Sequence, residues 1–185
     1  MEIEKRNNLG NLINSLNLDG SGIEIGVNCG DYSEILLKTS RLKKIYLLDL
    51  WERLPKEQYT DITNTSQNEQ NNKYNMVIEK MKGYGERVQI IRKDCSIAFN
   101  DFGDSFFDFI YIDANHKYEY VKQDINNWYP KLKNGGLFSG HDYLDGKIGR
   151  TVFGVKMAVD EFCKLINKTP IITIDSPCPS WYFVK

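Results

Sequence analysis

Short apolar runs alternate with segments of helical periodicity along most of this chain. The stretch GIEIGV at 22–27 is rich in β-branched residues and flanked by glycine, which predicts a short buried strand. Segment 31–40, which follows it, has apolar residues at helical spacing. Because the same β-α step recurs, a parallel sheet covered by helices is predicted, with further strands at 44–50, 87–93 and 107–114 and further helices at 72–85 and 118–133.

The C-terminal part of the chain departs from this alternation. GGLFSGHDY at 135–143 predicts a fifth strand, and 154–166 predicts an amphipathic helix. Two apolar runs, 171–174 and 181–185, then follow so closely that we expect them to pair antiparallel. The predicted fold class is α/β: a doubly wound, mostly parallel seven-stranded sheet with helices on both faces and an antiparallel C-terminal strand.

Composition limits the kind of protein this can be. The 185 residues suit one domain, 1–185, with a helix expected within 1–20, and the net charge of −1 favours neither nucleic acid nor a membrane surface. No apolar run approaches the roughly 20 residues that span a bilayer, and the first residues lack the features of a secretion signal, so we expect a cytoplasmic protein. We expect free, mostly buried thiols rather than a zinc or disulfide framework, because no C-x-x-C pair occurs among Cys29, Cys95, Cys163 and Cys178.

A glycine-containing turn follows the first predicted strand. Glu24, Gly26 and Gly30 form the pattern E-x-G-x-x-x-G, and Asp49 ends the next strand about 20 residues later, where a carboxylate can accept hydrogen bonds from ribose hydroxyls. A dinucleotide-binding turn more often has a further glycine where this chain has Asn28. Glu24 would repel a pyrophosphate but could pair with an ammonium group, so the turn favours a ligand with a cationic amino-acid end. The alternative is a turn without a ligand.

The segment between Trp51 and Asn72 is polar and rich in Asn, Gln and Thr, with no apolar period. We interpret it as a surface loop and a possible lid over a site. A frayed start of the following helix is the alternative, and the sequence leaves both open.

Both histidines of the chain lie at predicted strand ends beside aspartates. Asp113 ends the fourth strand, with His116 expected in the first turn of the next helix, and His141 and Asp142 end the fifth strand. Ligands of an open parallel sheet bind beyond the carboxyl ends of its strands, so these side chains could converge. Carboxylates with an imidazole suit a divalent metal, and His116 could act as general base. In the alternative interpretation neither histidine touches a ligand.

The turn after the first strand resembles motif I of the class I S-adenosylmethionine-dependent methyltransferases, and Asp49 in LLDLWE resembles the acidic residue of motif II. The resemblance runs from about Gly22 to the C-terminus and implies a Rossmann-like fold that binds S-adenosylmethionine. It also implies adenine contacts from the residues after the third strand. The implied cofactor-binding residues are Glu24, Gly26, Asn28, Gly30, Asp49, Leu50, Trp51, Asp94, Cys95 and Asp113.

The stretch from IDANHKYEY to SGHDY, with GVKMAVDEF and the final WYFVK, looks like the metal-dependent sugar O-methyltransferases of the macrocin and mycinamicin type. The resemblance makes Asp113, His141 and Asp142 the positions of a Mg²⁺ or Mn²⁺ site. It makes His116 the base and Asp113 a further catalytic residue. The chain departs from the family at His141, where a carboxylate is more usual, and in having only about 20 residues before the first strand.

The expected function is therefore methyl transfer from S-adenosylmethionine to a hydroxyl of a sugar or similar polyol, assisted by a divalent metal. The expected partner is a small-molecule or glycan acceptor, with no nucleic acid or membrane, and a homo-oligomer is left open. Two other classes remain as alternatives: a nicotinamide-dependent oxidoreductase and a non-catalytic module that binds a nucleoside. Glu24 and the missing middle glycine argue against the first of these.

Overall fold

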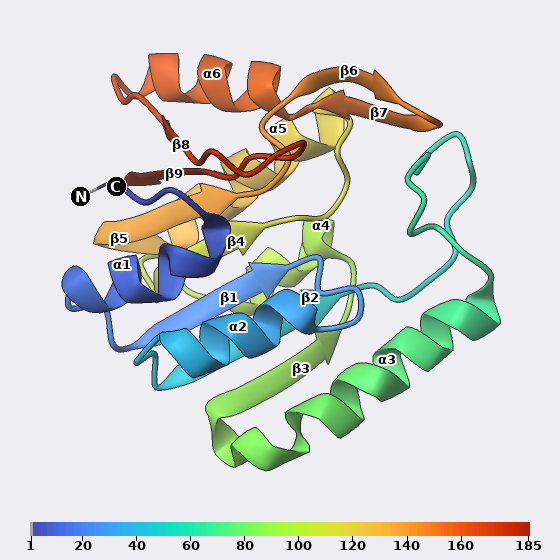
Figure 1. The fold of residues 1–185 in the computed structure, drawn as a ribbon, viewed down its shortest axis with the longest axis horizontal. Coiled ribbons are helices and arrows are strands. Elements are labelled where there is room, and N and C mark those ends of the chain that lie inside the picture. Colours follow the sequence, from blue (N-terminus) through green and yellow to red (C-terminus); the bar gives the residue numbers. More distant parts are fainter. Residues whose placement is uncertain (1) are drawn as a thin grey trace.

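Seven strands form one sheet with the spatial order β3-β2-β1-β4-β5-β9-β8 in the computed structural model, which describes residues 2–185 (Figure 1). β1 pairs in parallel with β2 and β4, β2 with β3, and β4 with β5, whereas β9 runs antiparallel to both β5 and β8. The strands are β1 (Ser21–Ile25), β2 (Lys44–Asp49), β3 (Val88–Arg92), β4 (Phe107–Ile112), β5 (Leu132–Gly140), β8 (Ile171–Ile172) and β9 (Trp181–Val184). The predicted fold class is confirmed.

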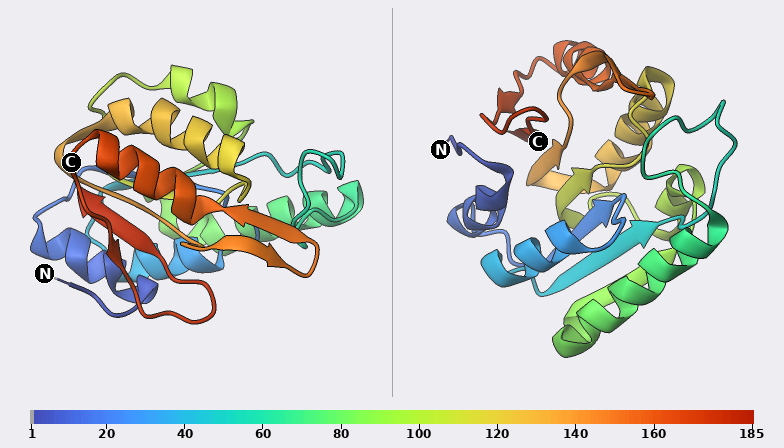
Figure 2. Two further views of the ribbon diagram at one scale, coloured as in Figure 1. Left: turned by 90° about the horizontal axis from the view of Figure 1, so that it is seen from above. Right: turned by 45° about the vertical axis from the view of Figure 1, so that its right-hand side comes forward.

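Helices cover both faces of the sheet (Figures 1 and 2). On one face, α1 (Leu9–Ser15), α2 (Asp31–Thr39) and α3 (Gln67–Met81) contribute apolar side chains to one buried cluster. On the other, α4 (Cys95–Ala98), α5 (Tyr118–Trp128) and α6 (Val155–Leu165) contribute to a second. Short 3₁₀ segments join these elements: η1 (Arg6–Asn8), η2 (Lys82–Arg87), η3 (Phe99–Asp101) and η4 (Tyr129–Lys131).

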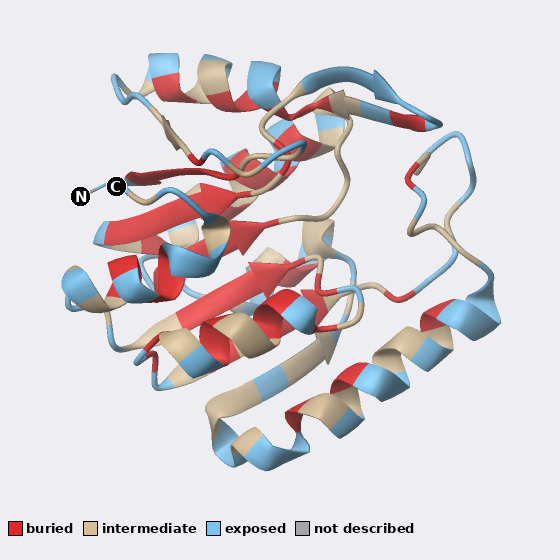
Figure 3. Ribbon diagram, viewed as in Figure 1, coloured by how far each residue is buried: buried red, intermediate tan, exposed pale blue. Residues whose placement is uncertain are grey.

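The central strands are almost continuously buried, as expected for parallel strands covered on both sides (Figure 3). Every residue of β4 is buried. Ile110 and Ile112 enter one cluster and Phe109 and Tyr111 the other, while Phe107, before a shift in register, joins Ile110 and Ile112. The order of strands reverses between β1 and β4, because β1 lies between β2 and β4. Such a reversal opens a crevice at the carboxyl ends of the strands, where ligands of this class of sheet bind.

Two local predictions are refined, and one pair of strands was not predicted. α3 begins at Gln67, five residues before the predicted start, because Ser66 and Glu69 form a capping box; the polar stretch is therefore a loop only from Leu50 to Ser66. A hairpin of β6 (Asp145–Ile148) and β7 (Thr151–Gly154) was not predicted. The predicted N-terminal helix occupies only α1, after η1.

Other sequence expectations concern the thiols and the membrane. Only Cys163 is buried among the four free cysteines, while Cys29, Cys95 and Cys178 are half-buried, so the expectation of mostly buried thiols is wrong. Within residues 2–185, no helix combines the length and the apolar character needed to cross a bilayer.

Candidate active site

A cavity of about 540 Å³ lies at the carboxyl ends of the parallel strands. The loop 50–66 and the β6–β7 hairpin contribute to its walls, together with the ends of the strands. The predicted site residues that line it are Gly26, Asn28, Asp49, Leu50, Trp51, Asp94, Cys95, Asp113, His116 and Asp142. Three predicted residues do not line it: Glu24, Gly30 and His141. The topology thus brings together most of the residues that the motifs singled out.

The two glycines of the turn after β1 meet different neighbours. Gly26 has a φ of +94°, and a Cβ built on it would lie 2.0 Å from the backbone oxygen of Asp113, so only glycine allows β1 and β4 to approach so closely here. Gly30 has a φ of +76° at the N-cap of α2, and a Cβ there would lie 3.2 Å from side-chain atoms of Val77 and Met81. Its small size therefore serves packing against α3 rather than the cavity.

Main-chain groups hold the carboxylate of Asp49. One oxygen accepts a hydrogen bond from the N–H of Asn28 at 2.8 Å and the other from the N–H of Trp51 at 2.9 Å. Burial raises the pKa of Asp49, and these backbone bonds act in the opposite direction. The indole of Trp51 donates to the backbone oxygen of Asn28 at 2.8 Å and packs on Tyr74, with 1% of the residue exposed. Trp51 therefore helps to fix the turn, and its role in binding a cofactor stays a prediction.

The residues after β3 form another end of the cavity. Asp94 caps α4 by accepting a hydrogen bond from the N–H of Ser96 at 2.8 Å. The thiol of Cys95 donates to Asp124 of α5 at 3.2 Å, and burial raises the pKa of Cys95 well above its ordinary value. Burial also raises the pKa of Asp124 to about 7. Asp124 lines the cavity and was not predicted, since nothing in the sequence places α5 beside α4.

Glu24 lies beneath the turn, inside the protein. It is 2% exposed, and its carboxylate accepts a hydrogen bond from the hydroxyl of Ser33 in α2. Burial raises its pKa to about 8, although the Ser33 bond acts in the opposite direction. Glu24 is therefore largely neutral at pH 7, and its pairing with an ammonium group of a ligand stays a prediction.

Asp113, His141 and Asp142 meet at the ends of β4 and β5. Each offers a ligand atom, and these atoms all lie within 4.8 Å of one another. His141 Nδ1 lies 3.3 Å from Asp142 Oδ2 and 3.7 Å from Asp113 Oδ2, which also faces Arg6 Nη1 at 3.7 Å. Burial would raise the pKa of Asp142, but the two histidines lower it. Two carboxylates and one imidazole fit a divalent cation such as Mg²⁺ or Mn²⁺.

His116 lies in the loop before α5, which begins at Tyr118, so its expected place in the first turn of that helix is wrong. Its Nε2 lies 2.9 Å from Asp142 Oδ2 and 3.6 Å from Asp113 Oδ1. Both ring nitrogens are buried, and neither meets the geometry of a hydrogen bond. Burial would lower the pKa of His116, but the surrounding carboxylates raise it well above 6.5. The imidazole of His116 stacks on Phe153, with ring centroids 5.1 Å apart.

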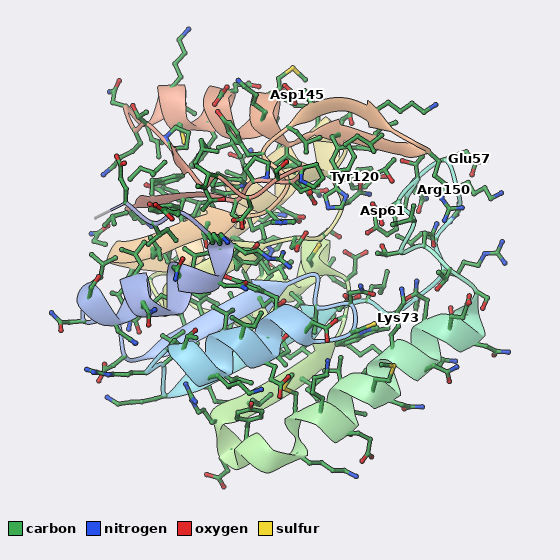
Figure 4. All side chains as sticks on the ribbon, in the orientation of Figure 1. Glu57, Asp61, Lys73, Tyr120, Asp145 and Arg150 are labelled. Carbon is green, nitrogen blue, oxygen red and sulfur yellow. The ribbon has the colours of Figure 1, made fainter. Side chains whose placement is uncertain are left out.

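Asp61 is a further member of this cluster that the sequence did not indicate. It lies on the loop 50–66 (Figure 4). Its Oδ2 is 3.3 Å from His116 Nδ1. A polar loop residue carries no periodicity, so only the folded chain reveals this contact. His116 is thus surrounded by three carboxylates from three parts of the chain.

The loop 50–66 and the β6–β7 hairpin close over the cluster together. Arg150 donates to the backbone oxygen of Ile62 at 3.2 Å, and the N–H of Val152 donates to Thr60 Oγ1 at 3.3 Å. The two segments therefore form one cover over the cluster.

A comparison with known families bears on what this cavity is for. A sequence model of a methyltransferase domain matches residues 23–143, which is more than half of the chain. The chain belongs to this methyltransferase domain family. The matched span of the methyltransferase contains the turn after β1, Asp49 and the cluster of Asp113, His116, His141 and Asp142.

Individual relatives of the methyltransferase are distant. The uncharacterized protein y4gI of Sinorhizobium fredii (strain NBRC 101917 / NGR234) is 33% identical over 69 residues, which are 37% of this chain and 8% of that protein. Among solved structures, a candidate caffeoyl-CoA O-methyltransferase from Staphylococcus aureus matches with a TM-score of 0.65 and 18% identity, covering 96% of this chain and 81% of that one. The 1,6-didemethyltoxoflavin-N1-methyltransferase of Burkholderia thailandensis, solved with S-adenosylhomocysteine, matches with a TM-score of 0.63 and 15% identity, covering 97% and 77%. At such identities, the structural matches show a shared fold.

Proposed function

We propose that this methyltransferase binds S-adenosylmethionine in the cavity and transfers its methyl group to a hydroxyl of a sugar or similar polyol. The observation that carries the proposal is the carboxylate of Asp49. It ends β2 on the cavity wall, and main-chain N–H groups hold both of its oxygens. A carboxylate held in this way can accept hydrogen bonds from both ribose hydroxyls. The structure solved with S-adenosylhomocysteine from B. thailandensis shares this fold.

The order of the strands suggests how the cofactor would lie. Because the strand order is β3-β2-β1-β4, the cavity passes from Asp94 and Cys95 through Asp49 to Gly26 and Asp113. We assign adenine to the first pair and ribose to Asp49. The amino-acid end and the sulfonium then lie near Gly26 and Asp113, which brings the methyl group toward the cluster around His116.

At this cluster the chain's own side chains would prepare the acceptor. Asp113, His141 and Asp142 would hold Mg²⁺ or Mn²⁺, with the imidazole of His141 favouring Mn²⁺ somewhat. A divalent cation, when bound, supplies positive charge that favours an ionised acceptor hydroxyl. His116 Nε2 faces the cluster and would take the acceptor's proton as the new C–O bond forms and the C–S bond of the cofactor breaks.

The proposal is tested by turnover. The protein with S-adenosylmethionine and Mn²⁺ is incubated with a panel of free sugars, nucleotide sugars and vicinal diols, and released S-adenosylhomocysteine and methylated product are measured. We expect product with at least one sugar or polyol hydroxyl. Methylation only at nitrogen or carbon would contradict the O-methyl assignment, and product only from aromatic diols would contradict the sugar assignment.

The two other classes give different results in binding experiments. A nicotinamide-dependent oxidoreductase would be stabilised against heat by NAD(H) or NADP(H), whereas the proposal predicts stabilisation only by S-adenosylmethionine or S-adenosylhomocysteine. A non-catalytic module would bind the nucleoside but give no product with any acceptor, and a His116→Ala variant would behave like the unmodified protein.

A further inference from the structure

The loop 50–66 brings one carboxylate into the interior of the site. Asp61 is 6% exposed, although most of its neighbours on this polar loop are exposed or half-buried. In Figure 4, Asp61 lies between the loop and the body of the protein, while Glu57 lies at the outer part of the loop. A buried carboxylate on an otherwise polar loop is costly unless it has partners, so its contacts require an explanation.

The partners of the Asp61 side chain are Thr63 on the same loop, Thr151 on the β6–β7 hairpin and His116. Its Oδ1 accepts a hydrogen bond from the N–H of Thr63 at 2.7 Å. Its Oδ2 faces both His116 Nδ1 and the hydroxyl of Thr151, each at 3.3 Å. Burial would raise the pKa of Asp61, but His116 and Thr63 lower it to about 2. Oδ2 of this carboxylate is therefore shared between the hydroxyl of Thr151 and the ring of His116.

We propose that Asp61 is a positioning residue for His116: it binds Nδ1 of the imidazole and thereby directs Nε2 at the cluster of Asp113, His141 and Asp142. The other contacts of the ring agree with this role. Phe153 stacks on one face of the imidazole, and the backbone oxygen of His116 accepts a hydrogen bond from the N–H of Gly154 at 2.8 Å. Those contacts fix the plane of the ring and the position of its main chain. Asp61 is the residue that faces Nδ1, and it therefore sets how the ring is turned within that plane.

A carboxylate on the Nδ1 side has a defined chemical effect. It favours the tautomer that carries the proton on Nδ1, which leaves Nε2 free to accept a proton. The residue stands on the cover and not on the sheet, so the arrangement of His116 depends on the loop lying closed. This part of the inference rests on the proposed function, in which His116 receives the proton of the acceptor.

The loop is held closed by contacts that do not involve Asp61. Tyr59 donates to the backbone oxygen of Ala114 at 3.3 Å, and Lys117 donates to the backbone oxygen of Glu57 at 2.5 Å. Within the loop, Asn64 fixes its shape by donating to the backbone oxygens of Leu54 at 2.9 Å and Tyr59 at 2.8 Å. Replacing the Asp61 carboxylate by an amide therefore leaves these contacts in place, and its effect on His116 can be measured separately.

Nuclear magnetic resonance of the imidazole nitrogens tests the proposal without any acceptor. The chain has only two histidines, so a long-range ¹H–¹⁵N spectrum contains two ring systems, and a His141→Asn variant assigns them. We expect Asp61→Asn to move the Nδ1 resonance of His116 and to leave His141 unchanged, and Asp61→Glu to restore the shift at least in part. Glu57→Gln, which removes a carboxylate from the outer part of the same loop, should move neither. Identical His116 resonances in the unmodified protein and Asp61→Asn would overturn the proposal.

Turnover with any acceptor found in the panel supplies the second measurement. Asp61→Asn should lower kcat about 10- to 100-fold, as loss of a carboxylate behind a functional histidine commonly does, while KM for S-adenosylmethionine changes little. In a His116→Ala background the same substitution should have no further effect, because the two residues act together. Independent, multiplicative losses would contradict the role. If no acceptor is turned over, the proposed function fails while the resonance test of Asp61 still stands.

Discussion

Gly26 and Asp113 touch through their main chains: a Cβ added to Gly26 would lie 2.0 Å from the backbone oxygen of Asp113 and 2.4 Å from its carbonyl carbon. The N–H of Asp113 in turn donates to the backbone oxygen of Ile25 at 2.7 Å. The turn after β1 and the end of β4 therefore form one unit, which joins the proposed cofactor turn to the proposed metal cluster. Gly26, which was expected to let a ligand approach the backbone, also lets the end of β4 approach the turn after β1.

Gly26→Ala should destabilise the protein. Its φ of +94° is strained for any L-residue, and the contact is with rigid backbone, so we expect a loss of at least about 1–3 kcal/mol. Urea unfolding measures this loss in the free energy of unfolding. Gly103→Ala is the matched control, since nothing lies within 4 Å of a Cβ there and its φ is not positive. Equal unfolding midpoints for Gly26→Ala and Gly103→Ala would contradict the contact.

Glu24 should make stability depend on pH. Its pKa is raised from 4.5 to about 8 by burial, so between these values the folded state holds a proton that the unfolded state has lost, and stability falls as pH rises. Glu24→Gln removes this dependence. Relative to the unmodified protein, the variant should gain stability from pH 5 to 8, by at most about 1.4 kcal/mol per pH unit. Denaturant unfolding at several pH values measures the difference, and parallel profiles for the two proteins would show that Glu24 is not buried in its neutral form.

Asp142→Asn should weaken binding of a divalent cation. The residue is one of three that offer ligand atoms within 4.8 Å of one another. Loss of a supporting group near a metal commonly costs about 10- to 100-fold in affinity, so loss of a ligand should cost roughly 100-fold or more. Titration with Mn²⁺, monitored by electron paramagnetic resonance, measures this affinity. Asp104→Asn, at an exposed aspartate paired with Lys131, is the control. If Mn²⁺ does not bind to the unmodified protein, the proposed metal site is wrong.

His116→Ala should lower kcat by about 10²- to 10⁴-fold with any acceptor that is turned over, because a general base contributes typically that much. Affinity for S-adenosylhomocysteine should stay nearly unchanged, and Mn²⁺ affinity should not fall as it does in Asp142→Asn. Steady-state kinetics and Mn²⁺ titration are both needed. Full turnover would make His116 a bystander, whereas loss of Mn²⁺ would place it among the ligands.

The sheet could be predicted because its information is local. Each of the strands β1 to β5 contains a short apolar run. The position of an acidic residue at or just after a strand end, such as Asp49 or Asp142, can be predicted from that run alone. The predicted start of α5 at 118 is confirmed, but His116 was wrongly placed in its first turn, since the N-cap, Lys117, makes no side-chain capping bond. No cap residue therefore marked the boundary that puts His116 outside the helix.

The features that the sequence did not reveal depend on contacts distant along the chain. Every residue of β6 is exposed, so the strand has no alternation of apolar and polar side chains. Asp61 meets His116 across 55 positions, through a loop without periodicity. The burial of Glu24 depends on how α2 packs, since Ser33 covers its carboxylate. In each case a residue type was visible in the sequence, but its environment arises only when separate elements pack.

Calorimetric titration with S-adenosylhomocysteine tests the proposed cofactor site most directly, because it requires no acceptor and no metal. The unmodified protein should bind the ligand. Asp49→Ala should bind it roughly 10- to 100-fold more weakly, since hydrogen bonds to a charged group contribute about 1.5–3 kcal/mol. Asp101→Ala, which removes an exposed carboxylate paired with Lys93, should bind it as the unmodified protein does. Absence of binding, or equal affinities for the unmodified protein and Asp49→Ala, would contradict a cofactor site organised around Asp49.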